Sequence, residues 1–300
     1  MDASPFHFGP RRALGRTQFV VSQLGIGDLA DRSVAPETLV ATLHRALDAG
    51  LNVIDTAPNY EDGYSELVVG QALRGRREGV FLIDKIDHHD QPVEPQLNDS
   101  LVRLGLPSVD LLVFHAVSSM SVWNKLSARG GGMEQLRVAI QAGKARFRGI
   151  SSHHPEVLIA AIESGLCDVV MFPLGPYCDG RYGRQVLPLA KERRVGTVCF
   201  KAFGAGKLLG DTEGYGRPIG DAKAVPAQPV MPRLTVEECL RCALTYDPDV
   251  ALLGMSNPSE QDQAFAAAMR FEPMGEEALA DVRRRATEAI NGKGQVWWNP

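Results

Sequence analysis

Residues 52–85 of the chain are NVIDTAPNYEDGYSELVVGQALRGRREGVFLIDK. The apolar runs at 52–57 and 80–85 are short and contain β-branched residues, which is typical of buried parallel strands. The segment 65–75 between them has the apolar spacing of a helix and ends in glycine, as helices often do. This stretch therefore predicts one strand–helix–strand unit with parallel strands.

The same alternation continues on both sides of this unit. Apolar runs that predict strands occupy residues 24–27, 52–57, 80–85, 109–116, 145–151, 168–174, 196–202 and 250–256. Amphipathic segments at 36–50, 95–106, 133–144, 155–166 and 259–270 predict further helices. Eight strands with no topological break favour a closed (β/α)₈ TIM barrel over a doubly wound sheet. We expect one domain spanning residues 1–300.

Three segments lie outside this repeat. Residues 13–24 have a polar turn between short apolar stretches, which predicts an N-terminal β-hairpin that could plug the lower end of the barrel. Residues 204–233 are rich in glycine and proline, and long connections of this kind are usually functional lids or mobile segments. Residues 274–291 predict an extra C-terminal helix, which is followed by Trp297 and Trp298.

Composition limits the partners. The chain has 32 basic and 36 acidic residues, a net charge of −4, and no run of five or six basic residues. This balance argues against binding to nucleic acid or to an anionic membrane. The N-terminus has no apolar export signal, and no apolar run is long enough to span a membrane. We expect a cytoplasmic protein whose partner is a small molecule.

Cysteine and histidine patterns do not predict a metal site. Of the five cysteines, only Cys239 and Cys242 are spaced as CxxC, inside a helical pattern, and no second pair follows. We interpret the cysteines as reduced structural thiols. The doublets at 88–89 and 153–154 are adjacent histidines, whose side chains point apart on a strand or a helix, so solvated loop histidines are expected.

Ionisable residues gather at three consecutive strand ends. Asp55 ends the strand at 52–57, Lys85 ends the next strand, His115 ends the one after that, and Tyr60 follows Asp55 in its loop. Alone, each has an ordinary interpretation, such as a helix cap, a packed aromatic or a solvated side chain. The 30-residue spacings from Asp55 to Lys85 and from Lys85 to His115 place all of them on one rim. In TIM barrels this rim carries the active site.

These four residue types form a proton-transfer system. Protonation of a carbonyl oxygen during hydride transfer needs a weak acid, and free tyrosine, with a pKa of about 10, is poorly suited. A lysine ammonium beside Tyr60 would lower that pKa, and an aspartate would hold the lysine in place. A neutral histidine would add a hydrogen bond that orients the substrate carbonyl.

Residues 55–73, DTAPNYEDGYSELVVGQAL, resemble the signature of the aldo-keto reductase family, in which Asp and Tyr belong to a catalytic tetrad. Lys85 and His115 stand where that family places the other two members. The resemblance extends from residues 11–27 to residues 254–268, and residues 143–158 are similar to the family segment that runs into the fifth strand. It implies an oxidoreductase that interconverts a carbonyl and an alcohol with NADP(H), less often NAD(H).

The resemblance also implies cofactor contacts. Ser151 and Ser152 would face the nicotinamide carboxamide, and Phe200 would stack on the nicotinamide ring. The loop after Lys201 would follow the pyrophosphate, because its backbone amides and Lys207 suit an anion. The full implied set is Gly27, Asp28, Ser151, Ser152, Met171, Phe200, Lys201, Ala202, Gly204, Gly206, Lys207, Gly254, Ser256, Asn257 and Gln261.

The chain departs from the family pattern at this site. Ser152 stands where the family usually has Asn, and Met171 and Leu174 stand where it usually has Gln and Tyr. A 2′-phosphate binds best to cationic donors, yet the stretch after residue 254 has no Lys or Arg before Arg270. NADP(H) is thus the family's cofactor, and we expect either tolerance of NAD(H) or a weaker NADPH site.

The predicted substrate pocket is mostly aromatic and apolar. Its expected walls are Met120, Trp123, His153, Phe172, Tyr177, Trp297 and Trp298. This lining favours an aldehyde or ketone with an apolar portion, although sugars also stack on tryptophan. Two alternatives stay open: a nicotinamide-binding sensor or partner subunit with little turnover, and an NAD-dependent sugar or polyol dehydrogenase.

Overall fold

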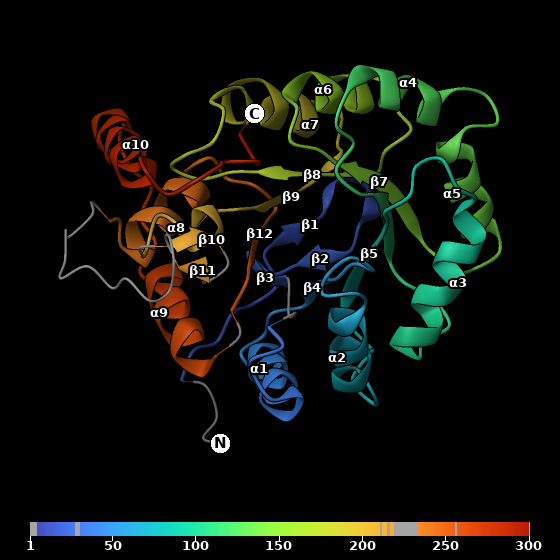
Figure 1. The fold of residues 1–300 in the computed structure, drawn as a ribbon, viewed down its shortest axis with the longest axis horizontal. Helices are drawn as coiled ribbons and strands as arrows, with labels where there is room; N and C mark the ends of the chain where they lie inside the picture. Colours follow the sequence, from blue (N-terminus) through green and yellow to red (C-terminus); the bar gives the residue numbers. More distant parts are fainter. Residues whose placement is uncertain are drawn as a thin grey trace.

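Eight parallel strands close into a barrel, as the sequence predicts (Figure 1). The structure is a computed structural model that describes residues 5–27, 31–210, 212–214, 217–218, 233–255 and 257–299. Neighbouring strands around the barrel follow chain order, and the last strand pairs with the first. They are β3 (Leu24–Gly27), β4 (Val53–Asp55), β5 (Phe81–Ile86), β6 (Leu111–Phe114), β7 (Phe147–Ser151), β8 (Val169–Pro173), β9 (Gly196–Phe200) and β12 (Val250–Leu253).

Helices surround the barrel (Figure 1). All those predicted are present, as is the C-terminal α10. Two were not predicted: α4, which Ser119 caps through a hydrogen bond from the Val122 amide, and α7, which follows a π-helical turn at Tyr182–Val186. The helices are α1 (Pro36–Asp48), α2 (Tyr64–Ala72), α3 (Val93–Leu104), α4 (Met120–Ser127), α5 (Gly132–Gln141), α6 (Pro155–Glu163), α7 (Leu187–Glu192), α8 (Val236–Thr245), α9 (Pro258–Met269) and α10 (Glu276–Ile290).

The strands separate two hydrophobic cores. Because side chains alternate along a strand, Val169 and Met171 of β8 point into the barrel, whereas Val170 and Phe172 pack under the helices. Phe172 is fully buried there and stacks on Tyr182 with ring centroids 5.5 Å apart. The expectation that Phe172 lines the substrate pocket is therefore wrong, because its strand position turns it away from the barrel interior.

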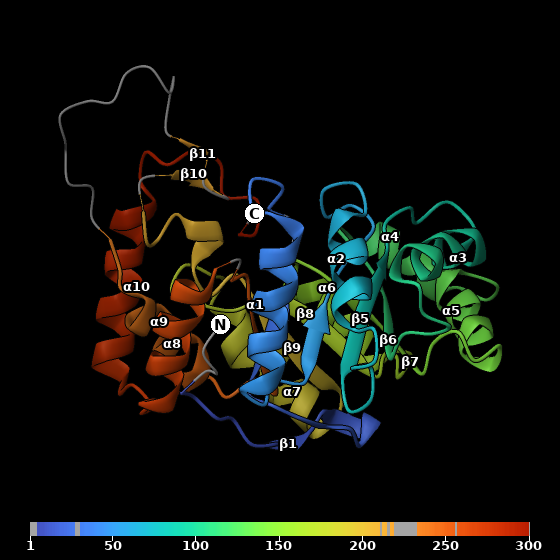
Figure 2. The ribbon, with the colours of Figure 1, turned by 90° about the horizontal axis from the view of Figure 1, so that it is seen from below.

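The N-terminal hairpin closes one end of the barrel. Strands β1 (Arg12–Ala13) and β2 (Val20–Val21) pair antiparallel and lie below the barrel, opposite β10 and β11 (Figure 2). Leu14 of the hairpin belongs to the barrel's interior core. Gly15 has φ +49°, and a Cβ there would stand 2.2 Å from the Gly196 amide nitrogen, so the plug requires glycine. The opposite end, at the C-terminal ends of the strands, is where an active site of a barrel lies.

The long excursion after β9 contains little regular structure among its described residues. It begins with a 3₁₀ turn at Gly204–Gly206 and has a short antiparallel pair, β10 (Thr212–Gly214) and β11 (Arg217–Pro218). The expected lid is not tested, since much of it lies outside the described residues. At the C-terminus, Trp298 is fully buried, and its indole nitrogen donates to the Tyr177 carbonyl at 3.1 Å.

The five cysteines are free and buried, as expected of structural thiols. Burial raises the pKa of the Cys167 and Cys242 thiols to about 12, so both stay protonated at neutral pH. Within the described ranges, no helix combines the length and the apolar character needed to cross a bilayer.

β5 carries a buried carboxyl, that of Asp84, directly before Lys85. The side chain of Asp84 is fully buried, and its Oδ1 accepts a hydrogen bond from the Lys85 amide at 2.8 Å. Its Oδ2 has no hydrogen-bond partner among the described residues. Burial, assisted by the nearby Glu66 carboxylate, raises the pKa of Asp84 to about 8. Asp84 is therefore mostly protonated at neutral pH in the folded protein.

We expect Asp84→Asn to stabilise the protein at alkaline pH. In the unfolded chain Asp84 ionises near 3.8, the ordinary pKa of an aspartate, whereas in the folded chain it stays protonated until about pH 8. Its contribution to stability is thus complete below about pH 4 and is lost as the pH rises to 8, by up to about 1.4 kcal/mol per pH unit. Asparagine stays neutral, so urea unfolding from pH 5 to 9 should show a flatter decline for the variant. Equal slopes for wild type, Asp84→Asn and the exposed control Asp90→Asn would contradict this account.

Candidate active site

Three strand ends bring Asp55, Tyr60, Lys85 and His115 together. The Lys85 ammonium lies 2.6 Å from the Asp55 Oδ1 and donates to the Thr56 carbonyl, also at 2.6 Å. The Tyr60 hydroxyl donates to the Asp55 Oδ2 at 3.4 Å, and the Lys85 Nζ lies 4.5 Å from the centroid of the Tyr60 ring. The rings of Tyr60 and His115 meet edge to face with centroids 5.7 Å apart.

Strand register and one tight loop produce this arrangement. β4, β5 and β6 are consecutive strands of the barrel, and Lys85 pairs with Val113, which lies two residues before His115. Tyr60 is followed by Glu61, Asp62 and Gly63, whose φ angles are 48°, 53° and 80°. Two successive non-glycine residues in the left-handed region are strained, and such strain clusters at functional sites. This turn joins Tyr60 directly to α2.

The lysine and aspartate form a buried ion pair. Lys85 is 1% exposed and Asp55 is 4% exposed. A buried charge needs partners, and the Lys85 ammonium has two in the Asp55 carboxylate and the Thr56 carbonyl. The pair therefore holds the Lys85 ammonium beside the Tyr60 ring.

A fifth residue, Asp87, was missed by the sequence analysis. Its Oδ1 lies 2.6 Å from the His115 Nδ1, and its Oδ2 accepts from the Asn59 amide at 2.9 Å. Burial would raise the pKa of Asp87, but the hydrogen bonds from His115 and from the Asn59 backbone amide, together with the Lys85 charge, outweigh it and lower that pKa. The signal was present, because Asp87 follows Lys85 by two residues, directly after the end of β5, and the alternation of the strand would place both on one side.

His115 is neutral in this site. Burial lowers its pKa, and the Lys85 charge adds to this effect, which together outweigh the opposing influence of Asp87. The ring is 16% exposed. The Asp87 carboxylate thus orients an uncharged imidazole at the rim.

The residues expected at the nicotinamide bind the neighbouring loop. The Ser151 Oγ accepts from the Ala116 amide at 2.8 Å, and the Ser152 hydroxyl donates to the Val117 carbonyl at 2.7 Å. Phe200, at the end of β9, is half-buried and meets His153 edge to face with centroids 5.6 Å apart. Met171 points into the barrel, and Ala202 is buried in the outer core.

The expected anion-binding role of Lys207 is wrong. Its ammonium is fully buried and donates to the carbonyls of Lys293 at 2.7 Å and Gln295 at 2.6 Å. In return, the Lys293 ammonium donates to the Lys207 and Gly210 carbonyls, at 2.8 Å each. Lys207 therefore attaches the C-terminal segment instead of facing the mouth.

The amides of the same loop are also engaged. The Gly204 amide donates to the Lys201 carbonyl at 2.9 Å, and the Gly206 amide donates to the Phe203 carbonyl at 3.0 Å. Lys201, directly after β9, lies near His153: after burial, its charge is the next cause that lowers the pKa of His153 to about 4. The Lys201 Nζ lies 5.9 Å from the ring centroid of Trp297.

The residues predicted to contact the cofactor near the first and last strands lie in different surroundings. Gly254 is exposed, and Gly27 lies so near Asp55 that a Cβ there would stand 3.6 Å from its Oδ2. Asn257 caps α9 in a capping box with Glu260. Asp28 and Ser256 lie outside the described residues.

Gln261 does not face a cofactor. It is fully buried; its side-chain amide donates to the Thr42 carbonyl at 2.7 Å, and its Oε1 accepts from Arg45 at 3.2 Å. It therefore joins α9 to α1. The helix turns it inward, which corrects the expectation that Gln261 binds the adenosine end.

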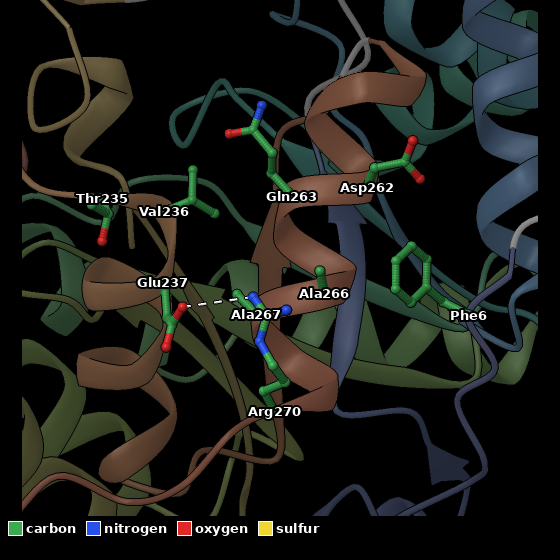
Figure 3. Close-up of a pocket in the computed structure, with 9 residues that line it drawn as sticks. All are labelled: Phe6, Thr235, Val236, Glu237, Asp262, Gln263, Ala266, Ala267 and Arg270. Carbon is green, nitrogen blue, oxygen red and sulfur yellow. Dashed lines mark ion pairs between the residues drawn. The ribbon is translucent and has the colours of Figure 1, made fainter.

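Arg270, the first cation after the last strand, lies in a separate groove on the outer helices (Figure 3). It pairs with Glu237 at 3.7 Å. The cavity has a volume of about 470 Å³ and is lined by Phe6, Thr235, Val236, Glu237, Asp262, Gln263, Ala266, Ala267 and Arg270. None of these residues comes from a strand end, so this groove is not the site that the tetrad forms.

The expected aromatic walls are only partly available. Trp123 is 3% exposed and Trp298 is 0% exposed, so both serve the core and offer almost no surface to a substrate. His153, Tyr177 and Trp297 are half-buried. The expectation that Trp123 and Trp298 line the substrate pocket is therefore wrong. Across the described part of the chain, no group of three His, Cys, Asp or Glu side chains is placed to hold a metal ion.

Comparison with known proteins supports the resemblance over most of the chain. The model of the aldo/keto reductase family matches residues 22–282. L-galactose dehydrogenase of Arabidopsis thaliana is 27% identical over 311 residues, which cover 90% of this chain and 92% of that protein.

Solved structures share the fold. An aldo-keto reductase of Bacillus halodurans has a TM-score of 0.68 at 21% identity, covering 98% of this chain and 100% of that one. An aldo-keto reductase of Klebsiella pneumoniae, solved with NADPH, has a TM-score of 0.67 at 20% identity, covering 92% and 94%. Because the family model spans nearly all of the barrel, the chain belongs to the aldo/keto reductase family.

Proposed function

We propose that Tyr60 is the proton donor of a hydride-transfer reaction at this rim, with Lys85 stabilising its phenolate, Asp55 holding Lys85 in place and His115 orienting the substrate. Membership of the family makes the chain an NAD(P)(H)-dependent oxidoreductase that interconverts a carbonyl compound and an alcohol. The observation that carries the assignment of roles is the buried Lys85–Asp55 pair beside the Tyr60 ring. A proton donor of this kind needs a stabilised conjugate base.

The cofactor, when bound, supplies or accepts the hydride at its nicotinamide ring. Two residues suit such a group: the half-buried Phe200 ring for stacking and the Lys201 ammonium for the pyrophosphate. The expected contact of Ser151 with the carboxamide stays a prediction, since Ser151 is 2% exposed and its hydroxyl oxygen accepts from the Ala116 amide. Gly254 is exposed after the last strand, and a Cβ there would meet only the Gly27 carbonyl oxygen, at 3.6 Å, so the backbone is open to a ligand at this point.

We propose that NAD(H) serves as well as NADP(H). A Klebsiella relative was solved with NADPH, which supports binding of the phosphorylated form. However, the chain has no Lys or Arg at residues 255–269, and Arg270 is paired with Glu237 in the outer groove. The 2′-phosphate would therefore lack the cationic donors that distinguish it.

The substrate is proposed to be a small carbonyl compound or alcohol. The half-buried aromatics Tyr177 and Trp297, together with His153, would contact it. The relative named L-galactose dehydrogenase supports testing a sugar as substrate. We place the protein in the cytoplasm, because its five free, buried thiols suit a reducing compartment.

Tyr60→Phe should lower kcat by about 10²- to 10⁴-fold, because it removes the proton donor. Cofactor affinity should stay nearly intact, since the phenol oxygen is not a proposed cofactor contact. Steady-state reduction of an aldehyde panel, followed at the nicotinamide absorbance, measures the effect. The matched control is Tyr64→Phe in the next turn of the same segment, which should keep wild-type turnover. Undiminished turnover in Tyr60→Phe would end the assignment.

Lys85→Met should slow carbonyl reduction at neutral pH, because the phenolate loses its nearby positive charge. The single variant also leaves Asp55 as a buried carboxylate without its partner, at a cost of about 3–5 kcal/mol in stability. The double variant Asp55→Asn, Lys85→Met removes both charges and so avoids most of that cost. A folded double variant with wild-type kcat at pH 7 would show that the charge is not needed.

Dissociation constants for NADPH and NADH should agree to within about tenfold, which corresponds to about 1.4 kcal/mol of binding free energy. Quenching of tryptophan fluorescence measures both, with Trp297 near the mouth as a reporter. A preference for NADPH of about a hundredfold or more would mean that cations outside residues 255–270 bind the 2′-phosphate.

A further inference from the structure

The contact between Asp87 and His115 determines which ring nitrogen carries the proton. An ionised carboxylate has only acceptor oxygens, so a nitrogen 2.6 Å from Oδ1 must be a donor. The lowered pKa of Asp87 keeps this carboxylate ionised at neutral pH. Nδ1 of His115 therefore carries the hydrogen.

The opposite nitrogen is consequently an acceptor. A neutral imidazole has one N–H, so a proton on Nδ1 leaves a lone pair on Nε2. Within the described residues, Nδ1 is the ring nitrogen of His115 that forms a hydrogen bond. Nε2, on the far side of the ring from Asp87, is thus the nitrogen available to a substrate.

This polarity conflicts with the role first expected of His115. A carbonyl oxygen also has only lone pairs, so it cannot form a hydrogen bond with an acceptor Nε2. Tyr60 already supplies a hydroxyl for the reacting oxygen. The partner that Nε2 requires is a second substrate group that donates, and the nearest such group is a hydroxyl on the carbon next to the reacting carbon.

We propose that Asp87 is a positioning residue that makes His115 an acceptor for a hydroxyl adjacent to the reacting carbon, so that the enzyme selects hydroxylated substrates over their deoxy counterparts. This specificity rests on the proposed function. The substrates it predicts are α-hydroxy ketones and aldehydes, and 1,2-diols in the reverse direction. A deoxy substrate would leave the Nε2 lone pair without its hydrogen bond in the bound complex.

Asp87→Asn should weaken this preference, because it reverses the polarity of His115. The backbone amide of Asn59 donates a hydrogen bond to the Asp87 Oδ2 at 2.9 Å, which requires an oxygen on that side of residue 87. The asparagine oxygen would keep this bond, and its NH₂ group would then face His115 Nδ1. Nδ1 becomes the acceptor, and the proton moves to Nε2, which now donates to the substrate.

The kinetic test compares hydroxyacetone with acetone. We expect wild-type kcat/KM to favour hydroxyacetone, and the hydroxyacetone-to-acetone ratio to fall by about 10- to 100-fold in Asp87→Asn, the range for a mismatched buried hydrogen bond. The control Asp90→Asn removes the same charge from an exposed position in the same loop and should keep the wild-type ratio. An unchanged ratio in Asp87→Asn would overturn the inference.

The spectroscopic test does not depend on turnover. Long-range ¹H–¹⁵N correlation spectra of the whole protein, with His115→Gln to assign the signal, distinguish the two neutral tautomers. We expect the Nδ1–H form in wild type and the Nε2–H form in Asp87→Asn. An Nε2–H signal in wild type would contradict the inference even if the variant failed to fold.

The failure of this inference can be told apart from failure of the proposed function. Loss of turnover in Tyr60→Phe together with an unchanged hydroxyacetone-to-acetone ratio in Asp87→Asn would reject only the role of Asp87. Full turnover in Tyr60→Phe would reject the proton-transfer assignment itself.

Discussion

The buried ion pair between Lys85 and Asp55 is the interaction on which the site depends. Both side chains are almost completely removed from water, so each needs the other to remain charged. The pair also joins two adjacent staves at the point where the barrel opens. The structure thus holds a fixed positive charge beside the Tyr60 ring, and the opposite end of the barrel is closed by the hairpin that contains Leu14.

A second contact, between the Asp87 carboxylate and the neutral His115 ring, determines the hydrogen-bonding polarity of the other half of the rim. Lys85 lies on β5 and Asp87 directly after it. Lys85 contacts the Tyr60 ring, and Asp87 contacts His115. A lysine stabilises negative charge, whereas a carboxylate fixes the proton on an imidazole. The rim therefore has a donating tyrosine and an accepting histidine, a polarity suited to a substrate with two neighbouring oxygens.

The fold and the four rim residues could be predicted because they depend on period and position. Apolar runs recur at the interval of a βα unit, and the ends of parallel strands meet at one rim, so Asp55, Lys85 and His115 converge in any closed barrel of this order. Other expectations failed where a single side-chain direction mattered. Phe172 is one residue out of phase with Met171, Gln261 lies on the inner face of its helix, and Lys207 binds the carbonyls of Lys293 and Gln295, which are more than eighty residues away.

The sequence by itself determined the strand order, the plugging hairpin and the four residues Asp55, Tyr60, Lys85 and His115 at the rim, since these follow from hydrophobic periodicity and local turn chemistry. Only the tertiary structure decided how those groups are bonded. Which nitrogen of His115 meets Asp87, and whether a lysine faces the mouth or the C-terminal segment, depend on contacts between residues distant in the chain. Such contacts have no period, and so they exist only once the barrel has closed.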